Sequence, residues 1–139
     1  MPQGPLETAG IRILVAEDNR ELQRLAKRAL ERKGYLVAQA FTAADILLEI
    51  ATDPLPDVLV LDFNLPDADG RDLLKRLKAD PRTAPMPTLV WSGRDADSER
   101  RIAIELGANE YVEKGSLSTL LAIIEQTLSR ISRGTIEET

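Results

Sequence analysis

Apolar residues along this chain gather in five short runs, and each run is followed by a segment in which apolar positions recur at helical spacing. The predicted strands are residues 11–16, 36–41, 58–63, 88–91 and 111–112. In the third run, 58–63, the one charge is that of Asp62. A continuous aliphatic run of this kind is typical of a strand that is covered on both faces, as in a parallel sheet.

Five helices are predicted between and after these strands. They are marked by apolar residues three or four positions apart: Leu22, Leu25, Ala26, Ala29 and Leu30; Ala43, Ile46, Leu47, Ile50 and Ala51; Leu73, Leu74 and Leu77; Ile102, Ala103 and Leu106; Leu120, Leu121, Ile124, Leu128 and Ile131. Gly34 and Gly107 follow the first and fourth helices, where glycine commonly ends a helix. Thr42 with Asp45 resembles a capping box at the start of the second helix, and the last helix is expected to end at about Gly134.

Strands that alternate with helices predict right-handed βαβ units and a doubly wound parallel sheet, which is an α/β fold. Of the two common strand orders, five strands favour 2-1-3-4-5, the flavodoxin-like order. This order places the carboxyl ends of the first and third strands side by side, where open sheets of this class bind their ligands. We expect residues 1–10 to form a flexible leader, 11–133 the folded domain and 134–139 a flexible tail.

The composition narrows the function. The net charge of −5 over 139 residues argues against direct binding to nucleic acid. The sequence contains no run of the length that a membrane span needs and no secretory signal peptide, so we expect a cytoplasmic protein without membrane contact. The chain lacks cysteine and histidine, which excludes thiolate chemistry and Ser-His-Asp catalysis. Chemistry here must use carboxylates, hydroxyls, lysine and backbone groups.

Three acidic residues are expected to meet at the carboxyl edge of the sheet. Glu17 and Asp18 follow the first strand, and Asp62 ends the third. Because their charges repel, a hard divalent cation with oxygen ligands would stabilise them; we expect Mg²⁺, with Mn²⁺ as the alternative. Asp62 ends the innermost strand and is the better candidate for a nucleophile that forms an aspartyl phosphate. Glu17 and Asp18 then serve as metal ligands, with the backbone carbonyl of Asn64 as a further ligand.

Other strand ends supply groups that phosphoryl transfer needs. Ser92 offers a hydroxyl, Gly93 allows a ligand to approach the backbone, and Lys114 brings a positive charge. Each of these has a simpler interpretation, Ser92-Gly93 as a plain turn and Lys114 as a solvated lysine. Tyr111, in the fifth strand, is by default a half-buried packing residue. Their coincidence at carboxyl ends of strands favours a phosphoryl-binding site.

Four segments resemble the receiver domain of two-component response regulators. They are Glu17-Asp18-Asn19, LDFNLPDADG at 61–70, WSG at 91–93 and YVEKG at 111–115, and the resemblance covers about residues 10–132. It implies that Asp62 is the phospho-acceptor and that Glu17, Asp18, Asp62 and the Asn64 carbonyl bind Mg²⁺. It also implies that the Ser92 hydroxyl turns toward the phosphoryl group, that Lys114 binds this group, and that Tyr111 is an aromatic switch.

The resemblance further implies a donor and an output. The donor is a histidine kinase or a histidine phosphotransfer protein. The charge of the first helix, rich in arginine and lysine, by itself favours an ordinary solvated face, and the resemblance adds docking of the donor as the alternative. Phosphorylation would alter a protein-interaction surface made by the fourth helix, fifth strand and fifth helix. The protein is then a phospho-accepting switch rather than an enzyme, although it assists its own phosphorylation and dephosphorylation. A homodimer through the same surface is a further hypothesis.

Two positions depart from the usual receiver pattern. Gly115 stands where proline commonly follows the lysine, so a cis peptide bond is not expected there and the following loop is expected to differ in shape. Trp91 is bulkier than the aliphatic residue expected before Ser92, and the sequence offers no reason for it.

Other hypotheses remain open. A Mg²⁺-dependent phosphohydrolase with an aspartyl-phosphate intermediate would usually carry a second acid two residues after the nucleophile, where this chain has Asn64. A flavodoxin-like cofactor module is disfavoured because Glu17 and Asp18 repel phosphate when no metal is present. Residues 133–139 are too few for an effector domain, so we expect either a stand-alone receiver or a fragment of a longer chain. The sequence names neither the cognate kinase nor the downstream protein target.

Overall fold

The computed structural model describes residues 10–93 and 97–138, with side chains up to residue 131. The predicted leader, apart from Gly10, lies outside the described residues, as does Thr139. No helix in the described part of the chain is both long enough and apolar enough to cross a bilayer.

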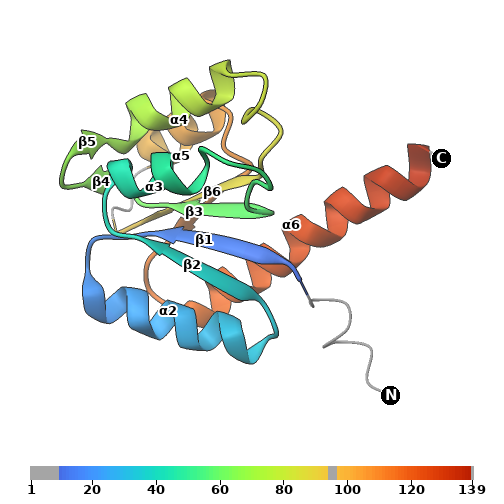
Figure 1. Ribbon diagram of the computed structural model, residues 1–139, viewed down its shortest axis with the longest axis horizontal. Helices are drawn as coiled ribbons and strands as arrows, with labels where there is room; N and C mark the ends of the chain where they lie inside the picture. Colours follow the sequence, from blue (N-terminus) through green and yellow to red (C-terminus); the bar gives the residue numbers. More distant parts are fainter. Residues whose placement is uncertain (1–9, 94–96, 139) are drawn as a thin grey trace.

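The core of the fold is a parallel sheet of five strands, ordered β2-β1-β3-β6-β7 (Figure 1). The strands are β1 (Arg12–Ala16), β2 (Leu36–Ala40), β3 (Val58–Leu61), β6 (Thr88–Ser92) and β7 (Glu110–Glu113). This is the predicted 2-1-3-4-5 order, so the doubly wound prediction is confirmed. Val58–Leu61 is fully buried in the centre of the sheet, as its aliphatic run indicated.

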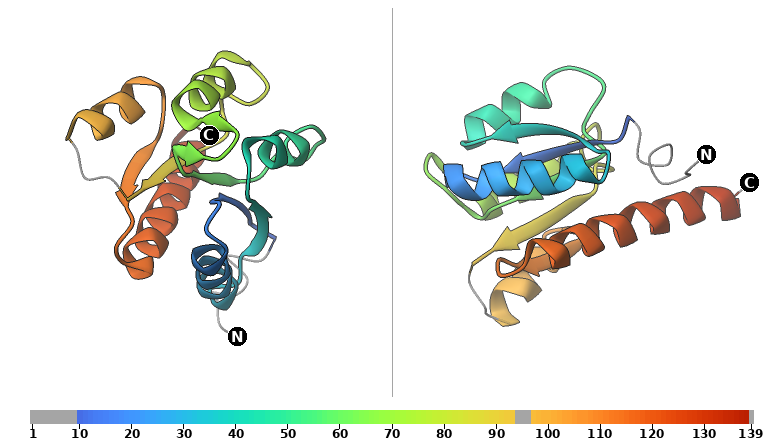
Figure 2. Two further views of the ribbon diagram at one scale, coloured as in Figure 1. Left: turned by 90° about the vertical axis from the view of Figure 1, so that its left-hand side faces the viewer. Right: turned by 90° about the horizontal axis from the view of Figure 1, so that it is seen from below.

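Two layers of helices cover the sheet (Figures 1 and 2). The helices are α2 (Arg20–Arg32), α3 (Ala43–Glu49), α4 (Gly70–Ala79), α5 (Asp97–Glu105) and α6 (Leu117–Glu138). Because side chains alternate along a strand, Ile13 and Val15 face α2 and α6, whereas Leu14 and Ala16 face α3, α4 and α5. Each face of the sheet therefore has its own hydrophobic core.

Local sequence signals explain where most helices begin and end. The Asn19 side chain accepts a hydrogen bond from Leu22 N (2.9 Å) at the start of α2. Thr42 Oγ1 accepts one from Asp45 N (3.0 Å) at the start of α3, as the capping prediction expected. Gly34, just after α2, has a φ of 94°, which glycine adopts without strain. These contacts fix the helices that follow the first two strands.

Three predicted helix ends were wrong. α5 ends at Glu105, one residue before the predicted Leu106. α3 ends at Glu49, before Ala51, and Ile50 is its C-cap. α6 continues to Glu138 instead of ending at about Gly134. A glycine inside a helix costs only about 1 kcal/mol relative to alanine, which a long helix tolerates. The tail predicted at 134–139 is thus helical up to Glu138.

The segment after Asp62 is more regular than the predicted loop. It forms an antiparallel hairpin from β4 (Asn64–Leu65) and β5 (Ala68–Asp69). At its tip, Asp67 accepts hydrogen bonds from Ala43 N (2.7 Å) and Ala44 N (3.0 Å), the first amides of α3. The hairpin is therefore fixed to the amino end of a helix that comes earlier in the chain.

Gly70 closes this hairpin against the end of β3. Its N–H donates to Phe63 O (2.9 Å), and a Cβ at this position would lie 2.5 Å from Phe63 Cα and 3.0 Å from Asp62 O. Any other residue would push apart the backbone on either side. Glycine is required here by close approach rather than by an unusual φ.

Candidate functional site

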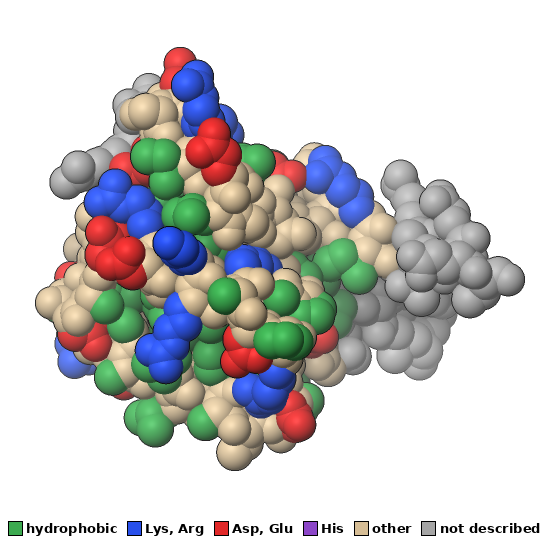
Figure 3. Space-filling view, turned by 90° about the horizontal axis from the view of Figure 1, so that it is seen from above, with side chains coloured by type: hydrophobic (Ala, Val, Ile, Leu, Met, Phe, Trp, Pro, Cys, Tyr) green, Lys and Arg blue, Asp and Glu red, His purple; other side chains and the backbone are tan. Residues whose placement is uncertain are grey.

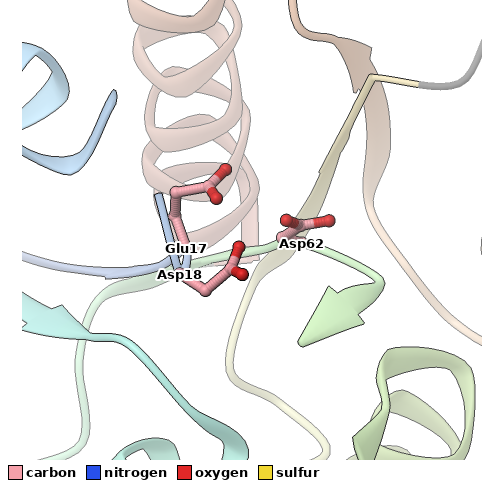
Figure 4. A group of neighbouring side chains, drawn as sticks. All are labelled: Glu17, Asp18 and Asp62. Carbon is pink, nitrogen blue, oxygen red and sulfur yellow. The ribbon is translucent and has the colours of Figure 1, made fainter. Parts of the chain in front are cut away.

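The three predicted acids meet where β1 and β3 end. The two strands are neighbours in the sheet, with Ala16 opposite Leu61, and Asp62 N donates to Ala16 O (3.1 Å). One carboxylate oxygen from each of Glu17, Asp18 and Asp62 lies within 4.8 Å of the others. Figure 4 shows the three side chains turned toward a common region at this edge. We refer to Glu17 and Asp18 together as the acidic corner.

Two of these acids are buried. Glu17 is 1% exposed and Asp62 3% exposed, whereas Asp18 is exposed. Backbone amides hold their carboxylates: Asn19 N donates to Glu17 Oε2 (2.9 Å) and Asn64 N donates to Asp62 Oδ1 (2.9 Å). Buried carboxylates are unfavourable unless they are paired with cations or hydrogen-bond donors. This edge of the sheet therefore favours a cation.

Lys114 supplies one positive charge to the buried acids. It follows β7, and its Nζ donates to Asp62 Oδ2 (2.9 Å) and forms an ion pair with Glu17. Burial raises the pKa of Glu17, and the bond from Lys114 only partly opposes this. Burial disfavours the charge of Lys114, but its bonds to Glu17 and Asp62 outweigh that effect and raise its pKa. Lys114 is therefore a paired lysine and not a solvated one.

Trp91 also contacts this lysine. Trp91 is fully buried on the face of the sheet that α2 and α6 cover. Lys114 Nζ lies 5.4 Å from the centroid of the Trp91 ring, a distance at which an ammonium is attracted to an aromatic face.

The peptide bond between Lys114 and Gly115 is trans, as the glycine at this position predicted. Among the described residues, the cis peptide bond is Asp53-Pro54.

Ser92 and Tyr111 lie together beside this cluster. Ser92 is the buried last residue of β6, and its side chain is hydrogen-bonded to that of Tyr111 in β7. Tyr111 is buried, and its hydroxyl donates to Glu99 Oε1 (3.1 Å) on α5. Burial raises the pKa of Tyr111, the bond with Ser92 opposes this, and Glu99 adds to it. Tyr111 is thus a packed residue that also makes polar contacts, and its role as an aromatic switch stays a prediction.

Gly93 and Asn64 complete the predicted set. A Cβ at Gly93 would lie 4.0 Å from Lys114 Cδ, in ordinary contact, so glycine is not required there by close packing, and its contact with a phosphoryl group stays a prediction. Asn64 is the first residue of β4, and its N–H is bound to Asp62. The role of its carbonyl as a metal ligand stays a prediction.

Three residues beside the site escaped the sequence analysis. Gln23 is buried on α2 and contacts the acidic corner, and its signal was a polar residue three positions before Ala26 on the apolar face. Glu99 accepts a hydrogen bond from the Tyr111 hydroxyl, and the Arg100 guanidinium lies 5.0 Å from the Tyr111 ring centroid. No sequence pattern marked Glu99 and Arg100, because their contacts depend on how α5 packs beside β7.

Comparison with known proteins identifies the family of this chain. The family model described as response regulator receiver domain matches residues 13–125. The chain belongs to this family. Receiver domains are signalling switches of two-component systems, and the structure of this one brings Glu17, Asp18 and Asp62 together at the carboxyl edge of its sheet.

Three similar proteins show how closely this chain matches known response regulators. The transcriptional regulatory protein CssR of Bacillus subtilis is 37% identical over 119 residues, which cover 86% of this chain and 51% of CssR. The receiver domain of Francisella response regulator 1452 superposes with a TM-score of 0.80 at 26% identity, covering 88% of this chain and 99% of that one. The Mn²⁺-bound form of response regulator Rcp1 has a TM-score of 0.70 at 26% identity, covering 83% and 89%. The chain spans about half the length of the curated relatives it matches.

Proposed function

We propose that this receiver domain accepts a phosphoryl group on Asp62 in a Mg²⁺-dependent reaction, with a histidine kinase or a histidine phosphotransfer protein as the donor. The observation that carries the proposal is the meeting of Asp62 with Glu17, Asp18 and Lys114 at one edge of the sheet. Family membership supports it, because phosphorylation and divalent-metal binding are general to receiver domains.

The residues present fit a hard divalent ion. Glu17, Asp18 and Asp62 offer only oxygen donors, and their three negative charges exceed the one positive charge of Lys114. We propose these acids and the Asn64 carbonyl as ligands of Mg²⁺, with Mn²⁺ as an alternative that the Mn²⁺-bound form of Rcp1 supports. When bound, the ion would offset the repulsion of the acids and draw charge from phosphoryl oxygens.

The chain's own residues provide the transfer chemistry. An Asp62 carboxylate oxygen attacks phosphorus, the new P–O bond forms, and the P–N bond to the donor imidazole breaks with the electron pair remaining on nitrogen. The Lys114 ammonium, 2.9 Å from Asp62 Oδ2, neutralises charge on the phosphoryl oxygens. The Ser92 hydroxyl and the backbone at Gly93 would supply further contacts. The same groups would assist later hydrolysis of the aspartyl phosphate.

The switch that we propose begins at Ser92. When its hydroxyl turns toward the phosphoryl group, the hydrogen bond that it now shares with Tyr111 is lost. Tyr111 bonds to Glu99 on α5, so the change reaches the surface formed by α5, β7 and α6. A downstream protein would bind this surface; we propose no direct contact with nucleic acid or membrane. Dimerisation through the same surface and a cytoplasmic location stay predictions.

The basic face of α2 is a candidate docking surface for the phosphoryl donor. It carries five cationic residues, Arg20, Arg24, Lys27, Arg28 and Arg32, with Lys33 at its C-cap, against Glu21 and Glu31. At its amino end, the Arg20 guanidinium lies 4.6 Å from the Phe41 ring centroid, near the end of β2. The opposite face, which carries α4 and is seen from above in Figure 3, instead shows positively and negatively charged side chains mixed together. A donor with an acidic surface would therefore be attracted to α2, which begins just after the acidic corner.

A mass measurement tests the phosphorylation. We expect incubation with acetyl phosphate and Mg²⁺ to add the mass of one phosphoryl group, labile in acid, and chelation of Mg²⁺ to prevent the gain. Asp62→Asn should abolish it, whereas Asp67→Asn, which changes an exposed acid on the neighbouring hairpin, should retain it. No gain in the wild type, or an undiminished gain in Asp62→Asn, would contradict the proposal. Many turnovers of inorganic phosphate release from small phosphate esters would favour the phosphohydrolase hypothesis.

A further inference from the structure

Gln23 is a buried polar residue on a helix whose outer face is charged. Its side chain is 1% exposed. The amide nitrogen Nε2 lies within hydrogen-bonding distance of three carbonyls, Val15 O (2.8 Å), Ala40 O (2.8 Å) and Glu17 O (3.1 Å). These carbonyls belong to the ends of β1 and β2 and to the acidic corner. One amide therefore contacts the backbone at the point where the chain leaves the sheet.

The donor end of this amide is the part that matters. All three neighbours are acceptors, so the NH₂ group and not the oxygen must face them. The other end, Oε1, is buried without a hydrogen-bond partner among the described residues. An unpaired buried acceptor is unfavourable, and an apolar side chain would avoid it. The presence of glutamine is therefore explained by its donor bonds and not by packing.

These bonds hold the main chain of Glu17. Glu17 N donates to Ala40 O (2.9 Å), and Glu17 O accepts a hydrogen bond from Gln23 Nε2. Both polar backbone groups of Glu17 are therefore held by hydrogen bonds. The carboxylates of Glu17 and Asp18 project from this piece of backbone toward Asp62. Without the amide, the acidic corner would have more freedom just where its oxygens must converge.

We propose that Gln23 is a positioning residue for the metal site: its amide fixes the acidic corner and so strengthens Mg²⁺ binding. This inference rests on the proposed function, because it assumes that the corner binds Mg²⁺. None of the contacts of Gln23 involves the side chains of Asp62 or Lys114. Its loss should therefore weaken Mg²⁺ binding while leaving phosphoryl transfer intact once Mg²⁺ is saturating.

The test replaces the donor and keeps the shape. In Gln23→Met, we expect the Mg²⁺ dissociation constant, measured by calorimetry with the metal alone, to rise about tenfold, at the low end of effects for groups that orient metal ligands. The Mg²⁺ concentration that half-saturates phosphorylation by acetyl phosphate should rise equally, and the maximal rate should stay near that of the wild type. A purely structural role would instead lower stability without this separation.

Ala26→Gly is the matched control. Ala26 lies on the same buried face of α2, close to one turn further on, and glycine there weakens the helix without removing a bond to the three carbonyls. We expect its Mg²⁺ dissociation constant to equal that of the wild type. An unchanged constant in Gln23→Met, or an equal rise in Ala26→Gly, would overturn the inference.

A measurement on the wild type covers the case in which Gln23→Met does not fold. The side-chain NH₂ resonances of Gln23 should be protected from hydrogen exchange and should shift on Mg²⁺ addition; exposed, unshifted resonances would overturn the inference. A wild type that binds no Mg²⁺ would overturn both this inference and the proposed metal site. A wild type that binds Mg²⁺ but takes up no phosphoryl group would overturn only the proposed function.

Discussion

Two half-buried lysines at opposite edges of the sheet have opposite surroundings. Lys114, at the carboxyl edge, bonds to Asp62 and pairs with Glu17. Lys78, on α4, donates to Ala84 O (3.0 Å) and Met86 O (2.7 Å), just before the amino end of β6. The ammonium group of Lys114 is thus bound by carboxylates, and that of Lys78 by neutral carbonyls.

The difference shows which edge is suited to a ligand. Burial lowers the pKa of Lys78, whose carbonyl partners carry no charge. The pKa of Lys114 is raised in spite of burial, because its partners are anions. At the carboxyl edge the acids outnumber the lysine, and the excess negative charge favours a divalent cation. At the amino edge the lysine completes the bonds of a connecting loop, and its role there is structural.

The largest expected effect separates the two lysines by function. Lys114→Met should slow phosphoryl uptake from acetyl phosphate by about 10²- to 10³-fold, the loss typical when one charged donor to a transition state is removed. Lys78→Met should change the rate little, because its bonds lie at the far edge. The rates are measured by mass spectrometry of the intact protein at saturating Mg²⁺. An equal loss in both variants would contradict the comparison.

A smaller effect should appear in stability at alkaline pH, measured by denaturant unfolding with a metal chelator. The folded pKa of Lys114 is above the ordinary lysine value of 10.5, so its contribution to stability is complete below 10.5 and is lost as pH rises through the folded pKa. The folded pKa of Lys78 is below 10.5, because its buried charge destabilises the folded state. The free energy of unfolding therefore increases as pH rises from the folded pKa to 10.5. The stability differences between wild type and Lys114→Met, and between wild type and Lys78→Met, should thus have opposite slopes with pH. Slopes of the same sign would count against the environments described.

The smallest effect concerns Asp67, an exposed acid close to the carboxyl edge. Hydrogen bonds from the amides of Ala43 and Ala44 lower its pKa. Its carboxylate therefore contributes stability above the ordinary aspartate value of 3.8, and this contribution is lost as pH falls through the folded pKa. We expect Asp67→Asn to lower the melting temperature slightly at neutral pH and the difference to vanish in acid. A difference that persists below the folded pKa would show that the carboxylate charge is not responsible.

Much of the carboxyl edge could be predicted from the sequence. The buried run that ends in Asp62 fixed the central strand, and the order of five strands then required Glu17 and Asp18 to lie beside it. Lys114 was assigned to the same edge because it follows the fifth strand. These predictions succeeded because strand ends in a parallel sheet are set by topology, which short apolar runs reveal.

The parts that were missed depend on contacts between elements. The hairpin at 64–69 has strands of two residues, too short for any periodicity. The bond from Tyr111 to Glu99 and the ring contact of Trp91 with Lys114 join residues that are distant in sequence. The donor bonds of Gln23 needed the positions of three carbonyls that no sequence pattern gives.

The close approach at Gly70 has a consequence for the cost of ligand binding. Because residues 63 and 70 are in backbone contact, the segment between them forms a small closed ring, and Asp67 attaches that ring to α3. Its conformational entropy is therefore already lost in the free protein. An ion that takes the Asn64 carbonyl as a ligand would order little additional chain, so most of the contact free energy would remain as affinity.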